Sequence, residues 1–222
     1  MRGSMFGQDA FVIETLRGQR GGFFLDSGAS DGVKGSNTVV LEQELGWRGV
    51  CVEPNPAFFA SLIRNRNCVC VNCCLYDRDG EVDFVEADVL GGILDEYHPR
   101  LLALATEVYA VPDAGAGRPT TVRRPARSVR SLLREVGAPA VIDYWSLDTE
   151  GSELSILRGF PFDEYAVRIL TVEHNHYPAR DEIRGFLAGH GYHVARELAV
   201  DDAFVRGDLV PSAAWRSAAW RR

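Results

Sequence analysis

The sequence predicts a doubly wound α/β fold with a mainly parallel sheet. Short apolar runs of strand length alternate with helical patterns along most of the 222 residues, and this alternation is typical of parallel sheets covered by helices. The last two runs, 192–198 and 202–206, follow each other directly and indicate a hairpin that adds an antiparallel strand at the far edge of the sheet. The length fits a single domain over 1–222.

The first half of the chain carries clear element boundaries. Asn37 is placed to cap a helix, and Pro56 stands where a proline opens one. The turn at 77–80 precedes an alternating pattern that is typical of a strand. In order, we expect a helix at 8–18, a strand at 22–25, a helix at 37–45, a strand at 48–53, a helix at 56–64 and strands at 68–72 and 81–87.

The second half resumes this order after an insertion at about 90–127. A stretch rich in proline and glycine at 112–119 predicts a mobile loop over a cavity. The core of the domain therefore spans about 22–206, and the tail 211–222 is either disordered or docks on a partner subunit, which would make the protein a homodimer. We expect a helix at 128–136, a strand at 140–147, a helix at 152–157, a strand at 167–172 and a helix at 180–188 closed by Gly189.

The composition of the chain indicates which classes of binding partner and which cellular compartment to expect. The 24 lysines and arginines are outnumbered by 31 aspartates and glutamates, so the net charge is −7, which argues against a nucleic-acid binder and against a polybasic membrane anchor. No apolar run reaches the roughly 20 residues that span a bilayer, and no charged-then-apolar leader opens the chain, so we expect a cytoplasmic protein. The cysteines favour buried thiols over a metal or redox site, because a zinc ribbon needs a second CxxC pair; they are Cys51, Cys68, Cys70, Cys73 and Cys74.

Polar residues and glycines gather directly after the predicted strands, where parallel sheets bind ligands. Asp26 ends the first strand and precedes a loop with Gly28 and Gly32, and Glu53 follows Gly28 by 25 residues. That spacing is near the about 20 residues of nucleotide sites, but Ser30 stands where the dinucleotide fingerprint needs a glycine. A carboxylate at Glu53 suits a ribose and one at Asp26 suits an ammonium group, a combination that S-adenosylmethionine (SAM) offers.

Five segments together resemble the FkbM-type methyltransferase family over about 22–205. They are Phe24–Gly28 with Asp31-Gly32, Val52–Pro56, Asn72–Asp77, Ser146–Leu154 with Leu157, and Thr171–Asn175. The chain departs from many relatives in the first loop, which has Ser30-Asp31 in place of an Asn and is lengthened by 34–36. The resemblance implies a Rossmann-like class I methyltransferase fold with SAM as cofactor, bound by Asp26, Gly28, Ser30, Gly32, Asn37, Glu53, Pro54, Asn72 and Cys73.

Titratable side chains follow the fourth and fifth strands. Asp148 ends the fourth strand, and Glu173 and His174 end the fifth, so we expect the three side chains to meet where the methyl group of SAM points. We interpret Asp148 and His174 as catalytic and all three as ligands of Mg²⁺ or Mn²⁺, an arrangement similar to that of small metal-dependent O-methyltransferases. Alternatively, Asp148 and Glu150 cap the helix at 152–157, and for Glu150 this interpretation is favoured.

Three further side chains are candidates for contact with the methyl acceptor, namely His98, His176 and Tyr177. A basic run either meets an acidic substrate or lies on a solvated edge strand; it consists of Arg123, Arg124 and Arg127.

These features favour O-methylation of a hydroxyl on a sugar or a small secondary metabolite, with that small-molecule acceptor as the partner. The alternatives are a metal-independent N-methyltransferase, a SAM-fold interaction module without catalysis and a nicotinamide dehydrogenase. The glycines of the first loop and the Asp148 group count against the inactive module, and the absent fingerprint glycines count against the dehydrogenase.

Overall fold

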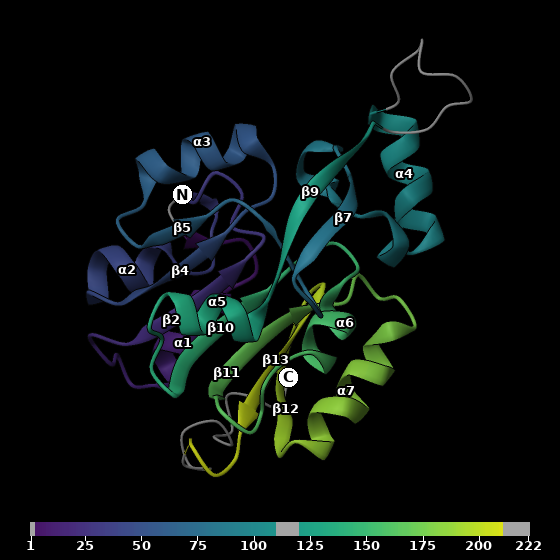
Figure 1. Cartoon of the computed structure of the whole chain (residues 1–222). Helices are drawn as coiled ribbons and strands as arrows, with labels where there is room; N and C mark the ends of the chain where they lie inside the picture. Colours follow the sequence, from purple (N-terminus) through teal and green to yellow (C-terminus); the bar gives the residue numbers. More distant parts are fainter. Residues whose placement is uncertain (1–2, 110–119, 211–222) are drawn as a thin grey trace.

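The computed structural model describes residues 3–109 and 120–210 and contains a seven-stranded central sheet (Figure 1). The expected loop at 112–119 and the tail 211–222 lie outside the described residues. β2 and β10 are neighbours in the middle, and the later strands are added outward from them in both directions, which creates a switch point of the kind where ligands bind. The strand order is β12 (Tyr192–Leu198), β13 (Asp201–Arg206), β11 (Ala166–Glu173), β10 (Val141–Leu147), β2 (Phe23–Ser27), β4 (Arg48–Val52) and β5 (Val69–Val71).

One strand of the central sheet runs against the others. β13 pairs antiparallel with both β11 and β12, whereas all other neighbours are parallel. The predicted hairpin is therefore present, but its antiparallel strand lies next to the edge of the sheet, not at the edge as the sequence led us to expect. The reason is that a helix returns the chain to start β12 parallel to β11, and the hairpin then inserts β13 between them.

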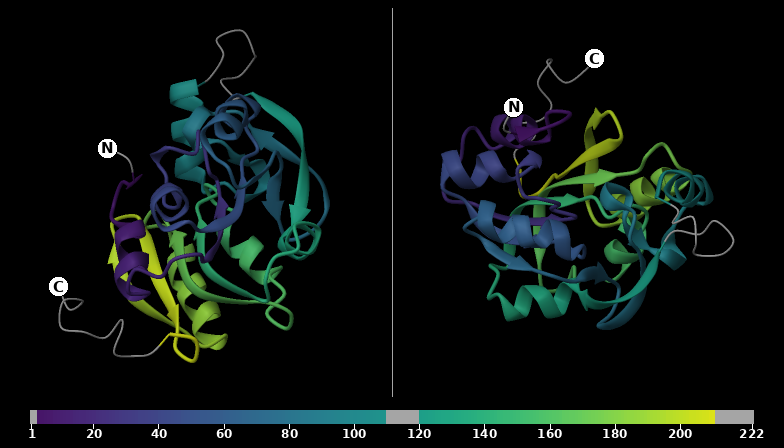
Figure 2. Two further views of the ribbon diagram at one scale, coloured as in Figure 1. Left: turned by 90° about the vertical axis from the view of Figure 1, so that its left-hand side faces the viewer. Right: turned by 90° about the horizontal axis from the view of Figure 1, so that it is seen from above.

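Helices cover both faces of the sheet (Figure 2). Phe24 and Leu25 are neighbours in β2 and belong to the two different cores, as the two-residue period of a strand requires. Both are fully buried, so the strand has no solvent-exposed face, and its first three residues, 23–25, are all apolar. The Phe24 core includes residues of α1 (Gln8–Thr15), α2 (Val39–Leu45) and α3 (Pro56–Asn65). The Leu25 core includes residues of α5 (Val129–Glu135), α6 (Glu153–Arg158) and α7 (Ala179–Gly189).

The two helix starts predicted near the first loop have different outcomes. α3 begins as expected, because the Asn55 side chain accepts a hydrogen bond from Ala57 N and Pro56 is the first helical residue. The cap predicted at Asn37 is wrong. Thr38 is the N-cap residue of α2, and Ser36 Oγ accepts hydrogen bonds from the amides at the start of the helix. The Asn37 side chain donates to Ser146 Oγ instead.

A second, four-stranded sheet stands at the carboxyl ends of the central strands (Figure 1). It combines the predicted strand at 81–87 with parts of the insertion. The basic run lies on its central strand β9, not on an edge, and the three arginines pair with carboxylates, Arg123 with Asp83, Arg124 with Glu86 and Arg127 with Glu135. The strands are β6 (Cys74–Tyr76), β9 (Thr121–Ser128), β7 (Gly80–Val85) and β8 (Gly92–Ile93), and α4 (Pro99–Tyr109) follows β8 along the chain.

Two smaller features bear on the sequence predictions. All five cysteines are free, and Cys73 and Cys74 point into different cores, one under the central sheet and the other within the second sheet. Within 3–109 and 120–210, no helix combines the length and the apolar character needed to cross a membrane.

Candidate active site

A cavity of about 280 Å³ lies at the carboxyl ends of β2, β4, β10 and β11. One side is formed by the loop after β2 and by Glu53, and another by the loop after β10. The second sheet lines a further side of the cavity through Cys74, Phe84 and Ile93. Its Gly92 packs so closely on the loop after β10 that an added Cβ would lie 3.2 Å from the carbonyl oxygen of Glu150. Residues predicted to bind the cofactor and two of the predicted metal ligands, Asp148 and Glu173, therefore line one shared cavity.

The loop after β2 touches the loop after β10 at Gly28. Its φ is +83°, and a Cβ on this residue would lie 1.8 Å from the carbonyl oxygen of Asp148. Gly28 N also donates to Val52 O at 3.0 Å. A glycine is thus required here by contact between two protein loops, whereas the sequence suggested contact with a ligand.

Glu53 is the buried carboxylate at the end of β4. Its Oε2 accepts a hydrogen bond from Ser30 N and its Oε1 accepts one from Asn55 N, both at 2.7 Å. Burial raises the pKa of Glu53 to about 7 even though these two bonds favour the charged form. A carboxylate offers about four acceptor positions, so two remain for the hydroxyl groups of a ligand.

Asp26, at the end of β2, is also buried and faces the cavity. It accepts a hydrogen bond from the Thr38 hydroxyl, and a guanidinium nitrogen of the buried Arg66 lies 3.9 Å away. Burial raises the pKa of Asp26, and the charge of Arg66 opposes this shift.

The structure separates the nine predicted cofactor residues into two groups. Asp26, Gly28, Ser30, Asn37, Glu53 and Pro54 line the cavity. Gly32, Asn72 and Cys73 do not line it. Asn72 instead donates to the backbone oxygen of Glu53 and so supports the strand end, and Gly32 backs onto Leu62 and Arg66. Cys74 lines the cavity in place of Cys73, since successive side chains point to opposite sides.

Sequence reasoning missed several lining residues. Leu75 and Ser146 lie within two of the family segments, Phe58 follows Pro56 by two residues, and Phe84 lies on β7. Met5 directly follows the two-residue strand β1, and Lys34 begins the two-residue strand β3. Ser146 could have been predicted from the sequence. It lies on β10 two residues before Asp148, which directly follows the strand, so the two side chains are expected on the same face of the sheet.

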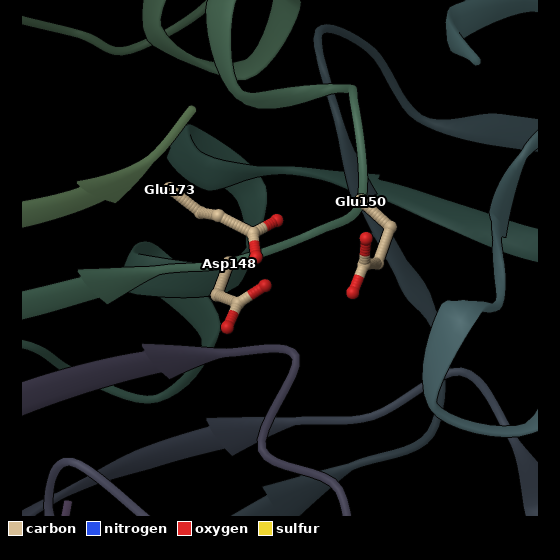
Figure 3. A group of neighbouring side chains, drawn as sticks. All are labelled: Asp148, Glu150 and Glu173. Carbon is tan, nitrogen blue, oxygen red and sulfur yellow. The ribbon is translucent and has the colours of Figure 1, made fainter. Parts of the chain in front are cut away.

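Three carboxyl groups that line the cavity lie close together, as Figure 3 shows. They belong to Asp148, Glu150 and Glu173, and one oxygen of each lies within 4.8 Å of the others. Asp148 directly follows β10, and its N–H donates to Ser27 O at 3.1 Å. Glu173 ends β11 and is only 8% exposed. Burial is the main cause that raises the pKa of all three carboxyl groups. Repulsion by Asp148 adds to the shift of Glu150 and Glu173, whereas for Asp148 the added repulsion comes from Asp201 and Glu153.

Glu150 was expected to cap the helix that follows, but Ser152 is the N-cap residue of α6 and no side chain in the described part of the chain caps this end by a hydrogen bond. The carboxyl group that binds amides of the loop before α6 belongs to Glu153. Glu153 accepts hydrogen bonds from Thr149 N and Gly151 N. Glu150 has a left-handed backbone, with φ +60°, which is uncommon for a residue with a side chain and is frequent at functional sites. Its Oε2 is buried and has no hydrogen-bond partner among the described residues.

His174 does not join the carboxyl group cluster. Its Nδ1 accepts a hydrogen bond from His176 N at 3.0 Å, and its Nε2 lies 3.7 Å from Asp202 on β13. The reason is that Glu173 and His174 are successive residues at the end of a strand and point in different directions. The structure therefore replaces the expected set of Asp148, Glu173 and His174 by Asp148, Glu150 and Glu173.

The remaining candidates lie outside the cavity lining. The rings of His98 and Tyr177 stack, with centroids 3.9 Å apart. This contact joins the start of α4 to the segment before α7, and neither residue, nor His176, lines the cavity.

The strand order and this cavity are consistent with the sequence family of the chain. Residues 26–194 match the family described as methyltransferase FkbM domain. The chain belongs to the FkbM methyltransferase family. The predicted family is therefore confirmed, as is the predicted Rossmann-like class I methyltransferase fold with its mainly parallel sheet.

Solved structures similar to this FkbM-family chain are also methyltransferases. Precorrin-6y C5,15-methyltransferase from Geobacter metallireducens GS-15 is 12% identical and matches over 89% of this chain and 85% of that chain, with a TM-score of 0.45. Methyltransferase FkbM from Methylobacillus flagellatus KT is 13% identical and matches over 83% of this chain and 43% of that chain, with a TM-score of 0.46. The putative RNA methyltransferase PH1948 from Pyrococcus horikoshii is 13% identical and matches over 90% of this chain and 83% of that chain, with a TM-score of 0.42. The chain thus spans less than half of the Methylobacillus protein. A search of curated proteins finds no match.

Proposed function

We propose that this FkbM-family methyltransferase transfers the methyl group of SAM to a hydroxyl of a sugar or of a small secondary metabolite. The observation that carries the proposal is the shared cavity, which has the Glu53 carboxylate on one side and the Asp148–Glu150–Glu173 group on another. A cofactor at Glu53 and an acceptor at the three carboxyl groups would lie side by side. Methyl transfer depends on such placement, because holding two reactants in line supplies much of the rate enhancement.

The lining residues fit SAM. Glu53 has acceptor positions left for two ribose hydroxyls, and Asp26 suits an ammonium group. Asn37 Oδ1 is buried without a hydrogen-bond partner among the described residues, which leaves an acceptor for a ligand. Apolar contacts for an adenine ring are offered by Phe58, Leu75 and Phe84. When bound, SAM supplies a methyl group on a positively charged sulfur, which is already an excellent leaving group.

The three carboxyl groups suit a hydroxyl acceptor, which must lose its proton. Burial raises the pKa of Asp148 toward neutrality, the range in which a carboxylate works well as a general base. We further propose that Asp148, Glu150 and Glu173 hold Mg²⁺ or Mn²⁺, whose charge would lower the pKa of a hydroxyl beside it. The buried Glu150 Oε2 without a partner supports this ligand set, because an unpaired buried carboxylate oxygen is costly.

A second candidate is N-methylation without a metal. The same cluster of carboxyl groups would bind an amine as its ammonium form and then accept its proton, which leaves a lone pair on nitrogen to attack the methyl group. The two candidates differ in their response to a chelator and in the acceptor that is labelled.

The proposed function is tested by incubating the protein with SAM carrying a labelled methyl group and a panel of hydroxyl and amine acceptors. We expect label in hydroxyl compounds of the sugar or secondary-metabolite type, with a mass increase of one methylene unit per transfer. Label confined to amines would favour the second candidate. No binding of SAM by the folded protein in calorimetry would contradict both.

Replacing Glu53 with alanine is expected to weaken SAM binding by tenfold or more. The change removes two charge-assisted hydrogen bonds to the ribose and also the acceptor that holds Ser30 N, together about 2–3 kcal/mol. Calorimetry at pH 7.5 measures the affinity, and circular dichroism checks the fold. Affinity equal to that of the wild type would contradict the placement of the ribose.

The same carboxyl group predicts a pH dependence. Burial raises the pKa of Glu53 to about 7, and ribose hydroxyls bind its ionised form, so SAM affinity should rise between pH 6 and 7.5 in the wild type. The ratio of wild-type to Glu53→Ala affinity isolates this effect from titration of SAM itself. A ratio that does not change with pH would show that Glu53 is already ionised at pH 6.

A further inference from the structure

The charges that line the cavity are very unequal. Among the lining residues within 3–109 and 120–210, Lys34 carries the only cationic side chain, and it is the only lysine of the sequence. Six carboxyl groups share the cavity with it, those of Asp26, Glu53, Asp88, Asp148, Glu150 and Glu173. A negatively charged group of any ligand would be repelled by these acids, so it is expected to settle beside Lys34.

The backbone of Lys34 is held firmly at this position. Lys34 and Gly35 form strand β3, which pairs in parallel with β1 (Gly3–Ser4). Asp31 Oδ1 accepts a hydrogen bond from Lys34 N at 2.9 Å. The Lys34 side chain is exposed and forms no ion pair within the described parts of the chain, so its ammonium group is available to a ligand.

Lys34 also lies on the side of the cavity where the methionine part of SAM is expected. The residues that follow it, Ser36 and Asn37, line the cavity, and Thr38 then binds Asp26, the group suited to the ammonium of that part. The methionine part carries a carboxylate next to its ammonium. A lysine is well suited to this carboxylate, because its charge is compact and its side chain is flexible.

We infer that Lys34 binds the carboxylate of the methionine part of SAM. The inference rests on the proposed cofactor. It means that the lengthened first loop, in which the chain departs from many relatives, recognises the carboxylate of SAM. Lys34 then offsets the repulsion between that carboxylate and the acids of the cavity.

The test compares SAM with decarboxylated SAM, which lacks only this carboxylate, by calorimetry on the full chain. Lys34→Met should weaken SAM binding about tenfold, the usual effect of losing a hydrogen bond between charged groups. The same variant should bind decarboxylated SAM within twofold of the wild type. Lys34→Arg should keep most of the affinity for SAM. Arg20→Met removes an exposed charge outside the cavity and controls for the change in net charge.

Each other outcome has a distinct meaning. Equal affinity of wild type and Lys34→Met for SAM would overturn the inference and leave the proposed function intact. An equal loss of affinity for SAM and decarboxylated SAM would also overturn it, because it would mean that Lys34 only supports the loop. If SAM affinity is unchanged but an acidic acceptor is methylated less efficiently by Lys34→Met, Lys34 binds the acceptor and the inference is also wrong. Absence of SAM binding by the wild type would instead contradict the proposed function.

Discussion

Replacing Gly28 with alanine is expected to abolish measurable SAM binding and to lower the free energy of unfolding by at least about 2 kcal/mol. The new Cβ would lie 1.8 Å from the carbonyl oxygen of Asp148, a distance that no side-chain adjustment relieves because both partners are backbone. The left-handed backbone, with φ +83°, adds its own strain for alanine. The loops after β2 and β10 must then move apart, and the cavity between them changes shape.

A matched control separates these two contributions. Gly137 also has a left-handed backbone, with φ +62°, but nothing lies within 4 Å of an added Cβ. Gly137→Ala should therefore lose only about 1 kcal/mol of stability and bind SAM as the wild type does. Denaturant unfolding and calorimetry measure both quantities. If Gly28→Ala behaved like Gly137→Ala, the contact between the two loops would not be what requires the glycine.

The central sheet was predictable because its signals are local. Strands such as β2 are buried on both faces, so they appear as short continuous apolar runs, and the glycines and carboxylates that follow each strand mark its carboxyl end. The helix start at Asn55-Pro56 is equally local. Each of these features is encoded within about six neighbouring residues, and no long-range pairing is needed to recognise it.

The second sheet was not predictable in the same way. β8 has two residues and β6 has three, too few for a period to be visible, and β6 pairs with β9 through contacts such as Cys74 with Ala126. Those partners are far apart in the sequence, with β7, β8 and α4 between them. The position of this sheet beside the cavity follows from the pairing, so the sequence predicted the strand at 81–87 but not the sheet to which it belongs.

Errors at the site arose from the direction of side chains. Positions were correct to within one or two residues, yet Cys74 lines the cavity where Cys73 was expected. Glu150 likewise joins Asp148 and Glu173 where His174 was expected. A shift of one residue in a strand turns a side chain to the other side. For Glu150 the direction of the side chain also depends on its left-handed backbone, which is followed by a positive φ at Gly151. No pattern of residue types in the sequence predicts this backbone conformation.

Removal of divalent cations is expected to stop methyl transfer to a hydroxyl acceptor. Excess EDTA should abolish turnover, and Mg²⁺ or Mn²⁺ should restore it, because oxygens of three carboxyl groups lie within 4.8 Å of one another and a cation would offset their repulsion. Asp148→Asn should lower turnover by roughly 10²–10⁴-fold, the range of a positioned catalytic group. Its SAM affinity should stay near that of the wild type, since the expected cofactor contacts lie at the ends of β2 and β4. Full turnover in EDTA would leave Asp148 as a simple general base.

Binding of Mn²⁺ tests the ligand set without any acceptor. Glu150→Gln is expected to weaken Mn²⁺ binding about tenfold or more, because even the loss of a residue that only hydrogen-bonds to a metal ligand lowers metal affinity by that much. Electron paramagnetic resonance of free Mn²⁺ measures the affinity. His174→Gln should leave the affinity unchanged, since the imidazole faces Asp202 and His176 and not the three carboxyl groups. The opposite pattern would restore the set expected from the sequence, with His174 as a ligand. Equal affinity in both variants and the wild type would show that Mn²⁺ binds elsewhere, and the raised pKa values of the cluster would then mean that it holds protons in place of a metal.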